Sequence, residues 1–567
     1  MRSPLFGLFI LAAWFLTYGC NSDDSSTDMQ SGSDSGQSST DIAHTMADNS
    51  TADSGTTTDD SNPSENDADT PKGDLVATSD VAELPDMPDE PQGPPPLEQR
   101  GFMAVRAAIH VHSAYSHDGC DGDGLLEDGT AKPECIDNIR HGICVSRLNY
   151  VLMTDHPANM RDYPFEKLVF YDPTAGDELV WDDNERAWAN RLMCPDGVTK
   201  IVTVGFEGTH TMAVGLKRHL VPKEMHSISI KDETTPEDLQ AVVAEVHAAG
   251  GLQLIAHSEQ DDLSAEVLIS LPIDGMEMYN VHANFNSALE KKPERLFLLE
   301  PYFDPAPGGP DPDLAALLLL DVFPTPSLDK WRTVVGAKQT TGVIGSDVHE
   351  NVNVSGYCDP GGSIEGLCDA LGADVPYVLA ALKKGGPVIM EDGERLDSYR
   401  RVFHWLHNRL LVTEFEPGAD QEAIVAGRNI AVFEVLGDPA GLDVVAQTTD
   451  GIWHEIGSRV PRSGNPILWI QVPPSPVPTP GVAWADAQMD AAELTVTIWH
   501  LTEGKEPAKV WESTQWGEQI HYAMEEVGAY QVELTMRPKH LLPWLTPNDD
   551  LAESTYRWAE VNPIYVY

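Results

Sequence analysis

The sequence predicts an α/β fold with a TIM-like barrel, followed by a C-terminal antiparallel β-sandwich. From Phe102 to about Arg400, short apolar segments alternate with helical or loop stretches, which is typical of a parallel sheet. After about Arg400, apolar segments follow one another through turn-rich connections, which is typical of antiparallel strands. At 567 residues, the chain is also too long for one ordinary domain.

Six apolar segments of the first part predict buried strands. They are Val105–Val111, Tyr150–Thr154, Ile201–Phe206, Leu252–Ala256, Gly275–Tyr279 and Thr341–Ile344. A helix is predicted over Pro236–Ala249, because proline begins it, acidic residues fill its first turn and two glycines follow it. Leu314–Leu320 is predicted to be helical as well. Strands that alternate with helices over this length favour a closed barrel.

Four segments after Arg400 predict the strands of the sandwich. They are Ile430–Leu436, Ile467–Val472, Glu493–His500 and Tyr530–Met536. The stretch from Val472 to Pro480 is too rich in proline for a central strand. A sandwich of about 150 residues has a usual domain size.

The N-terminus predicts a secretory signal peptide. Arg2 precedes a short apolar run, Leu5–Leu16, that is too short for a comfortable membrane span. The ending Leu16-Thr17-Tyr18-Gly19-Cys20 resembles a bacterial lipobox, although Thr17 stands where an aliphatic residue is usual. By that resemblance Cys20 would carry lipid and anchor the exported protein to a membrane of the cell envelope. Cleavage nearby without lipidation, which leaves a soluble protein, is the alternative.

The segment after Cys20 predicts a disordered linker. Asn21 to about Asp80 consists largely of Ser, Thr and Asp, and Pro85–Pro96 continues it as a stiffer spacer. The expected division is therefore a signal peptide over 1–20, a linker over 21–98, a barrel over 99–400 and a sandwich-like domain over 401–567.

The charge of the chain excludes one class of partner. Ninety acidic residues face 36 basic ones, for a formal net charge of −54. Phosphate backbones need basic surface, so we expect no nucleic-acid partner. Binding to anionic lipid through charge is disfavoured for the same reason.

Six cysteines besides Cys20 predict disulfides, since an even number is typical of exported proteins. Cys358 and Cys368 are the expected local pair. The other four are expected to form two more bridges, with the pairing left open; they are Cys120, Cys135, Cys144 and Cys194.

Metal-binding side chains lie at the end of each predicted barrel strand. They are His110 and His112, Asp155 and His156, Glu207 with His210 beyond it, His257, Glu277 with Asn280, and Asp347 with His349. A lone His-x-His is more often a polar strand end than a metal site. The ends of parallel barrel strands share one face, however, so we expect these side chains to converge. Mixed imidazole and carboxylate ligands suit Zn, Fe or Mn.

The ordered set of these motifs resembles the PHP (polymerase and histidinol phosphatase) metallohydrolase superfamily, over about Ala104 to Pro387. The motifs are His110-x-His112, Thr154-Asp155-His156, Gly205-Phe206-Glu207, Ala256-His257 and Gly345-Ser346-Asp347-x-His349. The stretches Glu207–Gly215, Glu277–Asn280 and Asn562–Val566 are similar to the carbaryl-hydrolase-like (CehA/McbA) branch. The resemblance implies a distorted (β/α)7 barrel with two or three Mn, Fe or Zn ions.

The resemblance also implies roles for individual residues. The implied ligands are His110, His112, His156, Glu207, His257, Asp347 and His349, with Glu207 bridging ions. The ligand after His-x-His is Asp118 or His117, of which we favour Asp118. Asp155 is expected to orient a ligand, and His210 to bind metal or hold the substrate. Ser258 stands where many relatives have proline, a departure that we expect to change little.

The expected chemistry is hydrolysis of a small molecule by metal-activated water, with Asp347 or His349 relaying the proton. A phosphoester would suit Lys217-Arg218, which follows His210, and Arg140; a solvated basic turn is an equal alternative. The carbaryl-type resemblance implies a carbamate, ester or amide instead. A third hypothesis is a non-catalytic surface lipoprotein that binds sugar or protein through its sandwich.

Overall fold

The computed structural model describes residues 93–122, 124–208, 210–220, 236–259, 263–284, 298–303, 309–320, 326–355, 358, 368 and 375–567. The predicted signal peptide, Cys20 and the linker up to residue 92 lie outside these residues. The chain from Gly93 to Tyr567 forms one compact unit. Among the described residues, no helix is both long and apolar enough to cross a membrane.

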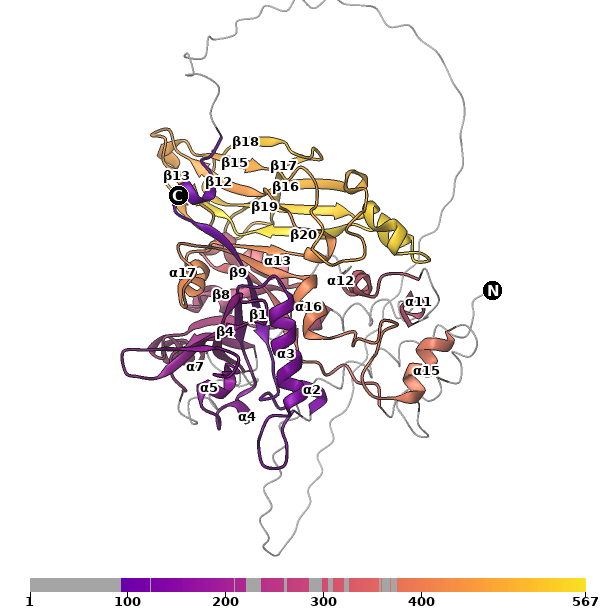
Figure 1. The fold of residues 1–567 in the computed structure, drawn as a ribbon. Coiled ribbons are helices and arrows are strands. Elements are labelled where there is room, and N and C mark those ends of the chain that lie inside the picture. Colours follow the sequence, from indigo (N-terminus) through magenta and orange to yellow (C-terminus); the bar gives the residue numbers. More distant parts are fainter. Residues whose placement is uncertain are drawn as a thin grey trace, which may run out of the picture. The chain divides into compact units, whose positions relative to one another are not determined.

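A closed barrel of seven strands forms the first part of the fold (Figure 1). In spatial order the strands are β1 (Met103–Val111), β2 (Tyr150–Met153), β5 (Thr199–Glu207), β6 (Thr211–Leu216), β7 (Leu252–Ile255), β8 (Gly275–Asn280) and β9 (Thr341–Val348), which returns to β1. The six predicted strands are all present, and the mixed α/β barrel is confirmed.

Strand β6 departs from the expected (β/α)7 pattern. It pairs antiparallel with both of its neighbours, β5 and β7, whereas the other barrel pairs are parallel. The sequence prediction missed it because β6 follows β5 after only three residues, 208–210, with no helix between them.

Helices connect most of the other barrel strands or follow the last of them, β9. The longer ones are α3 (Pro133–Val145), α7 (Pro236–Ala248), α8 (Ala265–Ser270), α13 (Pro326–Ala337), α15 (Pro376–Lys384) and α16 (Tyr399–Trp405). Helix α3 buries Cys135, Ile139 and Ile143, a four-residue spacing that faces the barrel. The predicted helix over Pro236–Ala249 is confirmed as α7. The predicted helix over Leu314–Leu320 is a 3-10 turn, Pro312–Ala316, followed by α12 (Leu317–Leu320).

The C-terminal part contains two sheets, which are antiparallel apart from one parallel pair, β14 (Arg459–Val460) with β21 (Ile564–Val566). One continues from the barrel, because β10 (His407–Val412) pairs with β1; its further strands are β11 (Asn429–Val432), β20 (Tyr556–Val561), β19 (Gly528–Arg537), β16 (Glu493–Leu501) and β17 (Ala508–Ser513). The other has the order β13 (Trp453–Glu455), β12 (Asp443–Gln447), β15 (Ile467–Gln471) and β18 (Gln519–Ala523). The sandwich and the domain boundary at residue 400, which lies within α16, stay predictions.

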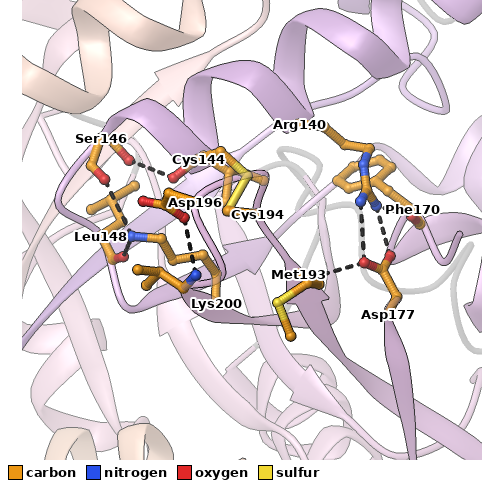
Figure 2. Close-up of a disulfide and its surroundings, with 12 residues drawn as sticks. Arg140, Cys144, Ser146, Leu148, Phe170, Asp177, Met193, Cys194, Asp196 and Lys200 are labelled. Carbon is orange, nitrogen blue, oxygen red and sulfur yellow. Dashed lines mark hydrogen bonds and ion pairs between the residues drawn. A yellow bond between two sulfur atoms is a disulfide. The ribbon is translucent and has the colours of Figure 1, made fainter. Parts of the chain in front are cut away.

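All six cysteines beyond Cys20 form disulfides, as predicted. The pairs are Cys120–Cys135, Cys144–Cys194 and Cys358–Cys368. Figure 2 shows that the second pair ties the end of α3 to the residue after β4 (Ala187–Met193). Beside it, Arg140 forms an ion pair with the buried carboxylate of Asp177, at 2.7 Å (Figure 2). The guanidinium of Arg140 is therefore engaged by a structural partner.

Candidate metal centre

A β-bulge brings His110 and His112 to the same site. Val105, Ala107 and Ile109 pack in one hydrophobic cluster, whereas Val111 packs in the cluster on the other side of the strand. The pairing of β1 with β2 and β9 shifts between Ile109 and Val111, and His110 has a left-handed φ of 65°. Regular alternation would place both histidines opposite Ile109. The bulge makes His110 an extra residue in the strand, so Val111 takes the opposite face, and His110 and His112 both reach Glu207 and Asp347.

Left-handed backbone recurs at the other strand ends. His210, His257 and Asp347 have φ values of 62°, 51° and 50°. Such conformations cost about 1–3 kcal/mol for residues other than glycine, and they cluster at functional sites where the surroundings enforce them. The backbone is thus bent where the candidate ligands leave their strands.

The first group of ligand atoms is fully buried and contains His110, His112, Glu207 and Asp347. Glu207 Oε2 lies 3.1 Å from Nε2 of both histidines. Asp347 Oδ1 lies 3.2 Å from His110 Nε2 and 3.4 Å from His112 Nε2. Two imidazoles and two carboxylates thus converge from β1, β5 and β9.

The second group contains His112, Asp118, His156 and His349. Asp118 Oδ2 lies 3.3 Å from His156 Nε2 and 3.2 Å from His349 Nε2. The ring of His112 stacks on that of His349 at 3.8 Å between centroids. His117, the alternative to Asp118, is exposed and packs its ring against His156 at 4.7 Å. The geometry therefore favours Asp118.

Glu207 lies at the centre of the cluster. Its Oε1 is 2.6 Å from His257 Nε2, while its Oε2 faces His110, His112 and, at 3.6 Å, His156. The two oxygens therefore contact different imidazoles, which is the arrangement that a bridging carboxylate requires. All eight residues expected as ligands lie together here.

His282 is a candidate ligand that the sequence analysis did not include. It forms a third group with Asp347 and His349, and its ring lies 5.7 Å from that of His349. It stands two residues beyond Asn280, just past the end of β8. The prediction used the last residues of each strand, whereas this histidine follows its strand.

Four of the histidines present Nε2 to the cluster, because another group occupies Nδ1. The partners of Nδ1 are Glu277 Oε1 for His110 (2.6 Å), Ser116 Oγ for His112 (3.1 Å), the Glu207 carbonyl for His156 (3.3 Å) and the Asp347 carbonyl for His349 (2.9 Å). Such outer contacts fix the tautomer and ring orientation of metal-bound histidine.

The donor set fits divalent ions. Within the described part of the chain, His110 Nε2, His112 Nε2, Asp347 Oδ1 and His349 Nε2 are buried without a hydrogen bond. Unsatisfied buried polar atoms are costly, and each of these four residues belongs to at least one of the ligand groups. Bound cations would satisfy them, and imidazole with carboxylate suits Zn, Fe or Mn. The number and identity of the ions stay predictions.

The electrostatics of the cluster keep its carboxylates ionised. Burial acts to raise the pKa of Glu207 and Asp347, but the imidazoles, of which His110 is the strongest influence, hold both values well below the ordinary range. Burial, followed by the charge of His349, lowers the pKa of His112. Burial acts to lower the pKa of His257 and His349 as well, but the neighbouring carboxylates raise these values to about 10 and about 9. Metal binding would therefore displace protons from these imidazoles, because ionised carboxylate and neutral imidazole are the forms that bind metal ions.

Two further predicted residues lie outside the three groups. Asp155 is buried and accepts hydrogen bonds from the backbone N and Oγ of Ser113, at 2.5 and 2.8 Å; burial raises its pKa to about 6. It thus fixes the residue after His112. His210 is buried at the start of β6, and its carbonyl accepts from Ala256 N at 3.2 Å. Its role toward metal or substrate stays a prediction.

The interpretation of Lys217-Arg218 as positive charge near the ions is wrong. Strand β6 runs away from the strand ends that carry the ligands, so Lys217 lies beside the start of β7, where its N donates to Ala249 O. Its ammonium lies 4.9 Å from the ring of Trp188, and Arg218 donates to the carbonyl of His219. The antiparallel direction of β6, which the sequence analysis missed, is the reason.

Comparisons with known proteins leave the family open. No family model matches the sequence, and no curated protein matches it. Among solved structures, the chain is similar to a two-domain protein from Bacteroides vulgatus that contains a predicted PHP-like metal-dependent phosphoesterase. The identity is 11%, the match covers 82% of this chain and 96% of that one, and the TM-score is 0.29. At this TM-score, the likeness supports neither a family nor an activity for this chain, so the geometry of the site is the basis for its function.

Proposed function

We propose that this protein is a metal-dependent hydrolase of the PHP type, with two or three Mn, Fe or Zn ions. Its substrate is a small molecule with a phosphoester or a carbamate, ester or amide bond. One observation carries the proposal: side chains from separate strand ends converge in three overlapping ligand groups, which share His112, Asp347 and His349. Shared ligands are what a polynuclear site requires.

Different residues of the cluster are suited to different steps of hydrolysis. Divalent ions bound here would acidify water and polarise the substrate oxygen. Asp347 points Oδ1 at His110 and turns Oδ2 toward His257, at 3.8 Å. One oxygen of Asp347 is therefore suited to hold an ion while the other accepts the proton of the attacking water. His349 is the second candidate for that proton.

The CehA/McbA-like part of the proposal is supported by sequence resemblance alone. Asn562, in the closing stretch, has a structural role: its side chain accepts from Gly342 N at 2.8 Å and donates to the Gly342 and Asn429 carbonyls. It thus ties β9 to β11. A substrate screen distinguishes phosphoester substrates from carbonyl substrates.

Elemental analysis and a substrate screen test the function. Protein expressed with Mn, Fe or Zn available should carry more than one ion per chain, and a finding of none would refute the site. The metal-loaded protein should hydrolyse 4-nitrophenyl phosphate or, instead, 4-nitrophenyl esters and N-methylcarbamates. His112→Ala and Asp347→Ala should abolish turnover while circular dichroism stays unchanged. If the metal-loaded protein hydrolyses none of these substrates, the non-catalytic binding role is favoured.

We also propose that the protein is exported and anchored through lipid on Cys20. The three disulfides support an oxidising compartment. Radioactive palmitate should label the wild type but not Cys20→Ser. Equal labelling of both would contradict the anchor.

A further inference from the structure

A small pocket opens beside the candidate metal ligands, between the ends of β8 and β9 and helix α16. Three of its lining residues are the third ligand group, His282, Asp347 and His349. Its other walls are largely apolar and include Val281, Val352, Leu396, Val402 and Trp405. Its volume is about 50 Å³, which is room for roughly three or four waters. The pocket can therefore receive a short group but not a large ring system.

Asp397 is the one acidic residue that lines the pocket without belonging to a ligand group, and hydrogen bonds compensate its charge. Asp397 accepts a hydrogen bond from Val352 N at 2.7 Å, and its two oxygens accept from Arg395 at 3.0 and 3.2 Å. Its carboxylate is thus neutralised within the wall. A group that enters the pocket meets mainly aliphatic side chains and one indole, beside the uncharged polar residues Ser346 and Asn351, which favours an uncharged partner.

Trp405 forms the aromatic part of this apolar wall. The residue is 2% exposed, and its Nε1 has no acceptor among the described residues. Buried indole N–H groups usually have a partner. Val402 and Trp405 lie three residues apart on α16, so they share the helix face that lines the pocket. The Nε1 atom itself is buried, so the indole presents its carbon atoms to the pocket.

We propose that this pocket receives a short, uncharged apolar group of the substrate, such as an alkyl chain of two to four carbons, which packs against Val402 and the indole of Trp405. The inference rests on the proposed hydrolase and names its substrate class: small compounds in which the scissile bond is flanked by a short apolar group. Val402 and Trp405 are then specificity-determining residues, and they lie on a helix beyond the barrel strands.

A binding measurement tests the pocket without turnover. In Zn²⁺-loaded protein labelled with ¹⁵N-tryptophan, the indole resonance that Trp405→Phe removes belongs to Trp405. Butanamide should shift this resonance, whereas formamide, which has the acceptor but no alkyl chain, should leave it in place at equal concentration. Val402→Phe, which fills the pocket, should abolish the shift. Phe403→Leu is the matched control, since Phe403 is buried on the same helix but does not line the pocket.

A kinetic series gives the second readout. From 4-nitrophenyl acetate to the butanoate, kcat/KM should rise about three- to fourfold per methylene, the usual gain for a buried methylene. Val402→Phe should remove the dependence on chain length. If butanamide does not shift the Trp405 resonance, the proposal for this pocket is wrong, whether or not the protein turns over a substrate. A resonance that shifts in a protein without turnover supports the pocket and refutes only the hydrolase.

Discussion

Glu277 and His110 form a buried carboxylate–imidazole pair, in which Glu277 Oε1 lies 2.6 Å from His110 Nδ1. The same carboxylate accepts from His257 N at 2.8 Å and from Asn280 Nδ2 at 3.1 Å. Glu277 thus holds two candidate ligands from different strands in place, although it is outside the three ligand groups. Such outer carboxylates also raise the basicity of the imidazole that they hold.

Glu277→Gln should weaken metal binding about 10- to 100-fold, because the amide keeps the shape but loses the charge that orients His110. Competition with a chromogenic chelator measures the affinity. Glu512→Gln, on an exposed strand, is the control and should bind metal like the wild type. Unchanged affinity in Glu277→Gln would show that this pair has no part in metal binding.

Gly345→Ala should damage the site indirectly. A Cβ at residue 345 would lie 1.9 Å from Glu277 Oε1, so the carboxylate must move. We expect a loss of about 1–3 kcal/mol in the free energy of unfolding, as for other overpacked positions, with weaker metal binding. A double-mutant cycle with Glu277→Ala checks the cause by denaturant unfolding. Gly345→Ala should lower the free energy of unfolding less in the Glu277→Ala protein than in the wild type. Equal losses in the two proteins would exclude the clash with Glu277.

Loss of different ligands should remove different numbers of ions. His112 belongs to two of the ligand groups, whereas His156 belongs to one. His156→Ala should therefore retain at least one ion per chain, and His112→Ala should retain fewer than His156→Ala. Elemental analysis after gel filtration measures both. The opposite order would contradict the assignment of His112 as a shared ligand.

From the sequence, the convergence of the candidate ligands could be predicted better than the strand pairing around them. His110, His112 and the other strand-end residues could be found because parallel barrel strands end on one face. The bulge at His110 and the direction of β6 could not, since both depend on pairing between distant segments. Glu277 was visible as a strand-end acid, but its contact with His110 spans 167 positions of sequence. His282 was missed because it follows its strand.

The buried imidazole of His540 should make stability depend on pH. It packs against the ring of Trp484, and burial lowers its pKa from 6.5 to about 4. The unfolded chain binds the proton below about pH 6.5, but the folded protein does so only near pH 4. Its contribution to stability is therefore full above pH 6.5 and falls by up to about 3 kcal/mol as the pH drops to 4.

Denaturant unfolding between pH 7 and 4 measures this effect. His540→Gln should show a shallower loss of stability with falling pH than the wild type does. His141→Gln, at an exposed position on α3, should follow the wild-type curve. Parallel curves for His540→Gln and the wild type would mean that His540 titrates normally in the folded protein.

The reversed strand β6 constrains how this scaffold can diversify. In a barrel of parallel strands, each strand opens into a connection at the catalytic mouth, and these connections tolerate insertions. Here the connection from β5 to β6 has three residues, between Glu207 at the centre of the ligand cluster and a strand that returns into the wall. A longer connection would shift the central carboxylate. Insertions are therefore better accommodated in other connections, such as the one that leads from β9 to α16.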